Sequence, residues 1–247
     1  MKRKLAVATA AALSLAFPTA IAGAAPSPTT GVELVKGAEN FDTVDASFDP
    51  DEGNSVGLPA LRELREWAWD ANPLYRGYGY EGFKQGTRLQ DVARKAGITT
   101  KEEYLDITAD SDLHWIAIQR AVESSVKFAH QRPDGSSIRT ATRGDTTPSL
   151  ESISAGVSLR DAIITHWGKN EVAELNRNGG VWSGATGHAV HLLHPNHKVW
   201  GFGQVKVPKT IYGQFGAAVN GDMKTDEADG GDMTSTGVRE AKLEIAR

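Results

Sequence analysis

The sequence predicts an α+β fold in which helices accompany a small antiparallel sheet. Apolar residues recur at helical spacing in two long stretches, about 113–129 and 158–178. Two strand-like runs, 198–207 and 210–219, follow them and are separated by a short turn. Together with a third strand, these two runs would make a small antiparallel sheet. A further run, 150–156, alternates apolar and polar residues and is either a strand or an extended turn.

The first 24 residues have the pattern of a secretory signal peptide. Met-Lys-Arg-Lys opens the chain, an apolar run from Leu5 to Phe17 follows, and small residues precede a predicted cleavage after Ala24. The apolar run is shorter than the roughly 20 residues that a membrane-spanning helix needs. We therefore expect a secreted protein, extracellular or at the cell surface, with no transmembrane segment in the mature chain.

Composition disfavours several classes of function. Cleavage after Ala24 would remove three basic residues and no acid, which moves the formal charge from −4 to about −7. An acidic chain is a poor ligand for the phosphates of nucleic acid, so we expect no nucleic-acid partner. The chain has no cysteine, so its core must stabilise it without disulfides, which its length allows. Cysteine-free export is also typical of bacterial proteins.

Four segments follow the signal peptide. Residues 25–57 are rich in Pro, Ser, Thr, Gly and acids, and we predict a flexible linker there. We predict an N-terminal helical extension over residues 58–109 and the main domain over residues 110–219. Residues 220–247 are rich in Gly, Asp and Glu, which predicts a flexible acidic tail.

The extension carries several helix signals. Pro59 suits a first helical turn, Gly97 is placed to end a short helix, and Thr100 with Glu103 forms a predicted capping box. Two short helices joined by a glycine turn also fit a DNA-binding helix-turn-helix. The signal peptide and the acidic charge argue against that alternative. The aromatic-glycine stretch 75–83 is expected to pack over the core rather than bind a ligand.

Histidines are concentrated before the first strand-like run. Four of the seven lie at His188, His191, His194 and His197. A spacing of three advances an α-helix by about 300°, so the four cannot share one helix face. Pro195 also interrupts the run. We expect His194 and His197 at the surface, and His191 lining or flanking a cleft with His188.

One acid falls on an otherwise apolar helix face. The inward stripe of the helix 158–178 comprises Ile164, Trp167, Gly168, Glu171 and Leu175. A buried carboxylate costs several kcal/mol unless it is paired or hydrogen-bonded. Glu171 is therefore expected to have a polar partner.

Four sequence blocks carry a resemblance to a known family. In order they are "LHWIAIQRAVESSVKFAHQRPDG", "ESISAG", "HWGKNEVAEL" and "SGATGHAVHLLHPNHKVWGFG". Together they resemble a bacterial CAP domain, of the SCP-like superfamily of cysteine-rich secretory proteins, antigen 5 and pathogenesis-related 1 proteins. The resemblance covers about 110–207 and implies an α-β-α sandwich with a central polar cleft.

The resemblance also implies a set of cleft residues. Two histidines and two acids line the family's cleft, and by matching motifs they fall on His130, Glu151, His188 and Glu171, with Trp167 as a flanking residue. The family places the second acid three residues after the tryptophan, where this chain has Asn170. Glu171 is preferred to Glu174 because of its apolar face. Ser152 stands in place of the family's asparagine beside Glu151.

This residue set supports more than one chemistry. Two imidazoles with nearby carboxylates suit a divalent metal ion, zinc first. Without metal, a histidine beside a glutamate can act as an acid–base pair, and the four groups can equally form a buried network that only stabilises the fold. No His-Glu-x-x-His or Gly-x-Ser-x-Gly motif is present.

We therefore expect a binding module rather than an enzyme. The expected ligands are a divalent metal and, by resemblance, a small apolar or lipid-like molecule or a cell-envelope component. The alternatives are a metal-assisted hydrolase that uses the same four residues, and a structural adhesion module.

Overall fold

A computed structural model describes residues 25–34, 41–77, 83–233 and 237–246. The predicted signal peptide, residues 1–24, lies outside these ranges. So does 78–82, the middle of the aromatic-glycine stretch, whose Tyr75 is fully buried and whose Phe83 packs against the core. Within the described ranges, no helix has the length and apolar character needed to span a bilayer.

In the described residues the main sheet has six strands, five of which are antiparallel neighbours in the order β5, β7, β6, β3, β8. Their bounds are β3 Phe41–Phe48, β5 Pro148–Ala155, β6 Val199–Lys206, β7 Gln214–Gly221 and β8 Arg239–Ala246. The short β4 (Thr108–Ala109) pairs in parallel with β6, and β1 (Ala25–Pro26) forms a separate two-stranded sheet with β2 (Glu33–Leu34). The two strands expected from the sequence are therefore present, at β6 and β7, and the run 150–156 forms most of the strand β5 and not an extended turn.

The helices begin where the sequence signals place them. Pro59 lies in the first turn of its helix, Thr100 and Glu103 form the capping box, and the Ser158 side chain accepts a hydrogen bond from the Asp161 amide. The helical elements are η1 Gly53–Gly57, α1 Leu58–Ala71, α2 Leu89–Lys95, α3 Lys101–Leu105, α4 Ser111–Val126, η2 Ile138–Thr140, α5 Leu159–Asp161, η3 Ala162–Asn170, α6 Glu171–Arg177 and α7 Gly187–Leu192.

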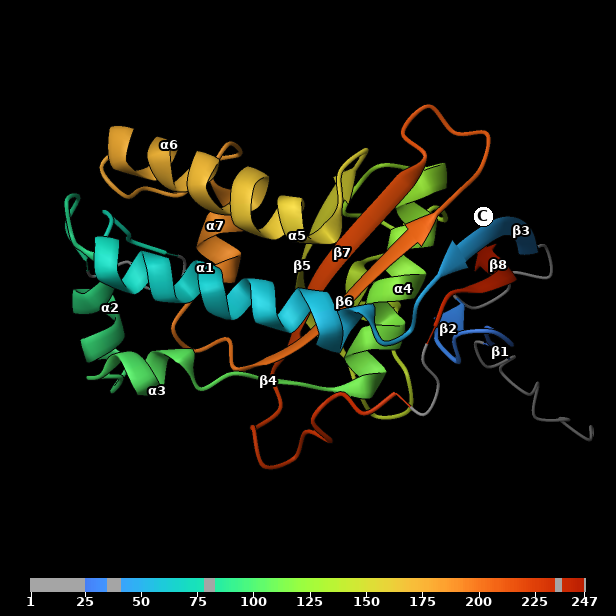
Figure 1. The fold of residues 1–247 in the computed structure, drawn as a ribbon, viewed down its shortest axis with the longest axis horizontal. Coiled ribbons are helices and arrows are strands. Elements are labelled where there is room, and N and C mark those ends of the chain that lie inside the picture. Colours follow the sequence, from blue (N-terminus) through green and yellow to red (C-terminus); the bar gives the residue numbers. More distant parts are fainter. Residues whose placement is uncertain (1–24, 35–40, 78–82, 234–236, 247) are drawn as a thin grey trace, which may run out of the picture.

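Helices cover both faces of the sheet (Figure 1). Successive side chains of a strand point to opposite faces, and on β6 Val199 and Val205 belong to the cluster that contains α4. Trp200 and Phe202 belong to the other cluster, with α1, α2, α3 and α7. The expected α+β class is therefore confirmed, with a sheet between two helical layers.

Glycines on β6 allow α4 to lie close to the sheet. A Cβ atom on Gly201 would lie 2.1 Å from the carbonyl of Leu113, and one on Gly203 would lie 2.6 Å from the amide of Ile118. Such distances are far below van der Waals contact, so any larger residue would force the helix away. The same two contacts show that α4 and β6 run in the same direction.

The predictions of a flexible linker over 25–57 and a flexible tail over 220–247 were wrong for much of both segments. β3 comes from the first and β8 from the second, and the two pair in register from Phe41–Ala246 to Phe48–Arg239. Leu243 and Ile245 alternate inward on β8 and are fully buried. The alternating residues of β8, such as Lys242 and Glu244, are polar because they face away from the core. Their polarity led the segment to be predicted as flexible and not as a strand with period-two alternation.

Residues 58–109 are not a separate extension. Leu61 and Leu64 of α1 belong to the same hydrophobic cluster as Trp200 and Phe202 of the sheet. α1 therefore forms part of the second helical layer, and the segments predicted as 58–109 and 110–219 share one core.

We predict that Leu243→Ala destabilises the protein by about 2–5 kcal/mol, because it leaves a cavity among fully buried side chains. Urea denaturation of both proteins measures the change in the free energy of unfolding. Lys242→Ala, at an exposed neighbouring position of β8, is the control and should have little effect. Equal stability of Leu243→Ala and the unmodified protein would contradict the placement of β8 in the core.

Candidate functional site

His130 and Glu151 meet at the edge of the sheet. Glu151 lies on β5, the edge strand, on the face that α4 covers, and His130 lies in the loop that follows α4. Their side chains approach to 3.2 Å between Nδ1 and Oε1. The imidazole is 63% exposed whereas the carboxylate is only 1% exposed, so Glu151 holds His130 from the interior and leaves its outer edge in solvent.

His188 and Glu171 form a second pair of the same kind. The His188 Nδ1 lies 2.6 Å from Glu171 Oε1, and the other carboxylate oxygen accepts a hydrogen bond from the Ala189 amide at 3.0 Å. The ring of Trp167 packs against that of His188, with centroids 5.5 Å apart. Glu174 instead pairs with Arg177. The structure therefore places Glu171, not Glu174, beside the histidine.

A wide helical segment accounts for the position of Glu171. η3 has π-helical hydrogen bonding from Ala162 to Asn170, and Glu171 follows at once as the first residue of α6. A π-helical turn contains more residues than an α-helical turn. A residue therefore has to be further along the chain from Trp167 to lie on the same face of the helix. Glu171, four residues after Trp167, thus directly follows a locally widened part of the helix.

The two pairs meet in one cleft. The rings of His130 and His188 lie 6.4 Å apart between centroids. The cleft has a volume of about 880 Å³ and contains both imidazoles and Glu151; its other lining residues include Ile138, Arg139, Leu150 and Trp182. Since His130 follows the helix on one face of the sheet and His188 lies on α7 over the other, the cleft spans the edge strand between the two helical layers.

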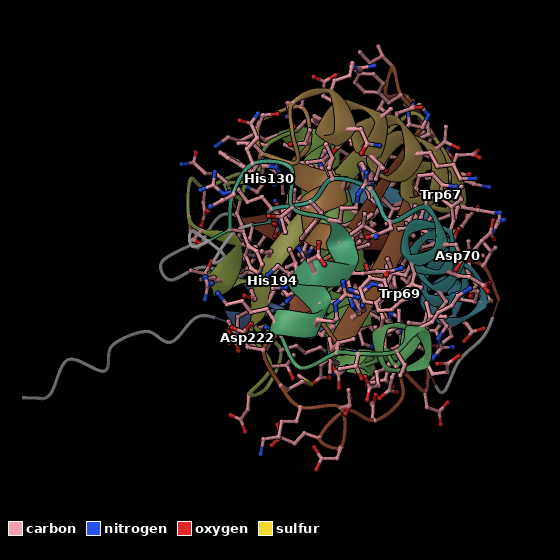
Figure 2. All side chains as sticks on the ribbon, turned by 90° about the vertical axis from the view of Figure 1, so that its left-hand side faces the viewer. Trp67, Trp69, Asp70, His130, His194 and Asp222 are labelled. Carbon is pink, nitrogen blue, oxygen red and sulfur yellow. The ribbon has the colours of Figure 1, made fainter. Side chains whose placement is uncertain are left out.

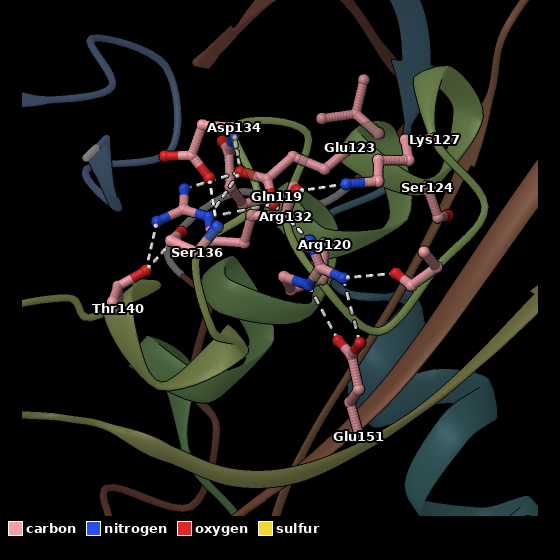
Figure 3. A network of polar contacts seen from close by, with 12 residues as sticks. Gln119, Arg120, Glu123, Ser124, Lys127, Arg132, Asp134, Ser136, Thr140 and Glu151 are labelled. Atoms are coloured by element: carbon pink, nitrogen blue, oxygen red, sulfur yellow. Dashed lines mark hydrogen bonds and ion pairs between the residues drawn. The ribbon is translucent and has the colours of Figure 1, made fainter. Parts of the chain in front are cut away.

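A buried ionic network lies beneath His130 (Figure 3). Arg120 donates to both oxygens of Glu151, through Nε at 2.8 Å and Nη2 at 2.9 Å, and it also donates to Glu123 and to the Ala129 carbonyl. Arg132 donates to Glu123 through Nη2 at 2.6 Å. These two arginines and two glutamates are each at most 1% exposed, so their charges balance within the interior.

The network keeps Arg120 charged and engages both carboxylate oxygens of Glu151 in hydrogen bonds. Burial by itself lowers the pKa of Arg120, but the hydrogen bonds and negative charges of Glu151 and Glu123 outweigh it, and the pKa is raised. Glu151 therefore shares its charge with a permanent cation. Its carboxylate can orient His130, but it is not available as an independent base or metal ligand.

His191 does not line the cleft, contrary to expectation. It is 2% exposed, and its Nδ1 lies 2.9 Å from Ser152 Oγ and its Nε2 2.9 Å from Asn220 Oδ1. Burial lowers the pKa of His191 to about 3. The neutral His191 ring can accept a hydrogen bond from Ser152 and donate one to Asn220, so both polar side chains have a defined partner. Trp167, also expected to flank the cleft, is 3% exposed behind His188.

His194 and His197 are only partly exposed. Their rings stack with centroids 4.1 Å apart, and burial lowers the pKa of His197. Figure 2 shows His194 apart from His130 on the same side of the molecule. The expectation that both are surface residues is corrected for His197, whose Nδ1 donates a hydrogen bond to the His191 carbonyl at 3.1 Å instead of facing solvent.

Sequence reasoning missed Arg65, a fully buried cation on α1. Its guanidinium donates to the carbonyls of Leu192, His194 and His197 at 2.9, 3.1 and 2.9 Å. Cations stabilise the carbonyl end of a helix, and Leu192 is the last residue of α7. Arg65 therefore fixes the end of the helix that carries His188.

A signal for the network was present in the sequence. α4 is predicted to be buried on most sides, and Arg120 and Glu123 stand three residues apart within it. Charges in a buried helix require partners. The same logic that singled out Glu171 would have identified them, although not their connection to Glu151.

The donor set fits a metal ion in part. Among the described residues, no group of three or more His, Cys, Asp or Glu side chains is arranged to hold a metal. The two carboxylates instead contact the Nδ1 atoms of His130 and His188, as carboxylates do behind metal-bound histidines. The Nε2 atoms are thus the donors with which these residues could bind an ion, and further ligands would have to come from solvent or a bound molecule.

Comparison with known proteins gives no assignment. No family model, no curated protein and no solved structure matches this chain.

We predict that stability falls as the pH drops from about 7 to 5.5. Burial lowers the pKa of His191 to about 3 and that of His114 to about 4, from an ordinary value of 6.5. Below pH 6.5 the unfolded chain binds protons that the folded chain does not, so each histidine contributes a loss of up to about 1.4 kcal/mol per pH unit. Urea denaturation across this range measures the slope, and His191→Gln should make it shallower. An unchanged slope would contradict a neutral, buried His191.

We also predict that Arg120→Ala destabilises the protein by about 3–5 kcal/mol, because Glu151 and Glu123 then remain buried without their common partner. Thermal and urea denaturation measure the loss. Arg177→Ala, which removes an exposed arginine–glutamate pair on α6, is the matched control and should have little effect. Similar small losses in both variants would show that the network does not stabilise the fold.

Proposed function

We propose that the protein is an exported, CAP-like binding protein whose cleft binds a divalent transition metal, zinc first, through His130 and His188. The observation that carries the proposal is the repeated arrangement of imidazole and carboxylate: each Nδ1 faces a glutamate, and the two rings lie 6.4 Å apart in one cleft. A carboxylate at Nδ1 fixes the ring and strengthens Nε2 as a metal donor.

The engagement of both acids favours binding over catalysis. Hydrolysis by a metal-bound water commonly requires a carboxylate or histidine that can accept a proton. Glu151 is held by Arg120 through both oxygens, and Glu171 by His188 and the Ala189 amide. Neither carboxylate is left as a separate base, so the metal-assisted hydrolase receives less support than a binding role.

The rest of the cleft suits an organic ligand beside the metal. Trp182 is 51% exposed at the cleft, and Ile138 and Leu150 add apolar lining. Arg139 supplies a cation at the same place. An apolar or lipid-like molecule, or a cell-envelope component with an acidic group, would match this mixture of surfaces. These ligand classes agree with what the family resemblance implies.

The zinc proposal predicts binding that depends on both imidazoles. Calorimetric titration of zinc into the chain beginning at Ala25 should show micromolar or tighter binding, and His130→Ala and His188→Ala should each weaken it at least about tenfold. His166→Ala, which removes an exposed histidine of η3 outside the cleft, is the matched control and should bind as the unmodified protein does.

Melting temperatures with and without zinc separate the alternatives. Zinc should raise the melting temperature of the unmodified protein and of His166→Ala, but not that of the two cleft variants. If zinc does not bind and the cleft variants melt far lower, His130 and His188 belong to a structural network instead. Turnover of a substrate that disappears in a folded Glu171→Gln variant would favour the hydrolase.

A further inference from the structure

The connection between β6 and β7 presents an apolar tip to solvent. We call residues 207–213 the hairpin tip. Within it Ile211 is 91% exposed and Tyr212 is 53% exposed. Figure 1 shows this connection projecting beyond the sheet and the helices around it. Large apolar side chains that stand together on a projection mark an interaction surface more often than isolated ones do.

The backbone of the hairpin tip holds this conformation without help from Ile211. The Val207 amide donates to the Gly213 carbonyl at 2.9 Å, and the Thr210 hydroxyl donates to the Val207 carbonyl at 2.9 Å. Lys209 and Gly213 adopt positive φ angles, 68° and 71°, that turn the chain back. The tip is therefore a preformed structure that displays Ile211, and the fold does not need that side chain for its core.

Further apolar groups lie at the same end of the molecule. α4 runs in the same direction as β6, since Leu113 lies over Gly201 and Ile118 over Gly203. Its C-terminal end is therefore directed toward the hairpin tip, as Figure 1 shows. Val126 and Phe128 at that end are 43% and 55% exposed, although the helical periodicity predicts that both are buried. The helix ends at Val126, so Phe128 leaves the buried face.

The charge of the tip complements an anionic surface. The hairpin tip contains one lysine, Lys209, and no acid, and Lys206 directly precedes it. Glu52 lies near Lys206, and Asp45 and Glu240 line a hollow with Pro208, so these acids offset part of the charge on the sheet side. Lys209, exposed at the turn itself, is the cation best placed to contact lipid headgroups beside Ile211.

We propose that the hairpin tip docks on a lipid bilayer, with Ile211 and Tyr212 inserted at the headgroup level and Lys209 among the phosphates. Tyrosine is favoured at that depth because its ring is apolar and its hydroxyl polar, and a lysine stem can follow the apolar groups while its charge stays in water. A projection with two apolar side chains fits a soft planar surface. This surface is separate from the cleft and does not depend on zinc.

Vesicle co-sedimentation of the chain beginning at Ala25, which contains every described residue of the fold, tests the proposal. Phosphatidylcholine vesicles with 3 parts in 10 phosphatidylglycerol should bind the protein, and pure phosphatidylcholine should bind it more weakly. Ile211→Ser with Tyr212→Ser should reduce partitioning by at least about tenfold, because the inserted apolar surface is lost. Lys209→Gln should reduce it by about fivefold on the anionic vesicles alone.

His166→Ser is the control. It removes an exposed aromatic ring of η3 that lies outside both the cleft and the hairpin tip, so it should leave vesicle binding unchanged. The tip variant should bind zinc as the unmodified protein does, and its melting temperature should fall only by what the edge contact between the Tyr212 and Phe215 rings contributes. Absence of vesicle binding, equal binding by the tip variant, or loss of binding in His166→Ser would each overturn the proposal. So would a dimer that dissociates in the tip variant, because the tip would then bind a second copy.

Discussion

The ion pair between Arg120 and Glu151 joins the helix α4 to the strand β5, the two elements that position His130 and Glu151 in the cleft. Arg120 lies on α4 and Glu151 on the edge strand β5, and their paired hydrogen bonds fix the helical layer against the sheet. Glu123 and Arg132 extend the network, and Arg132 also donates to the Glu33 carbonyl of β2 at 2.9 Å. Charges in a low-dielectric interior tolerate little displacement once paired. The position of the exposed His130 ring therefore depends on Glu151, which the buried arginines and Glu123 hold in place.

The second half of the cleft depends on a different buried cation. Arg65 donates hydrogen bonds to the carbonyls of Leu192, His194 and His197. Its guanidinium carbon also lies 5.1 and 5.5 Å from the ring centroids of Tyr104 and Trp200. Among the described residues no carboxylate pairs with Arg65, and backbone carbonyls and aromatic faces stabilise its charge instead. The end of α7 is thereby fixed, while η3 and α6 bring Glu171 to its other end. The cleft thus has two independently anchored walls, which is the arrangement expected of a preformed binding site.

More of the candidate site than of the surrounding fold could be predicted from the sequence. His130, Glu151 and His188 came from motif order, and Glu171 from the cost of leaving an acid on an apolar face. His191 could not be placed by spacing, because a hydrogen bond to Asn220, far along the chain, decides that it is buried. Sequence composition likewise suggested flexible ends, whereas β3 and β8 become strands only by pairing with each other. Each is about as polar as a linker because just one of its faces meets the core.

The sequence by itself determined the local elements and their chemistry: helix caps, the apolar periods of α4 and of 158–178, the strands β5 to β7, and the absence of disulfides. These depend on neighbours within a few residues, so they can be read without a fold. Only the tertiary structure decided which charges pair, where the chain ends lie and which apolar groups remain outside. Pairing and burial depend on contacts between distant segments, such as Ser27 with Glu244, and local periodicity contains no information about them.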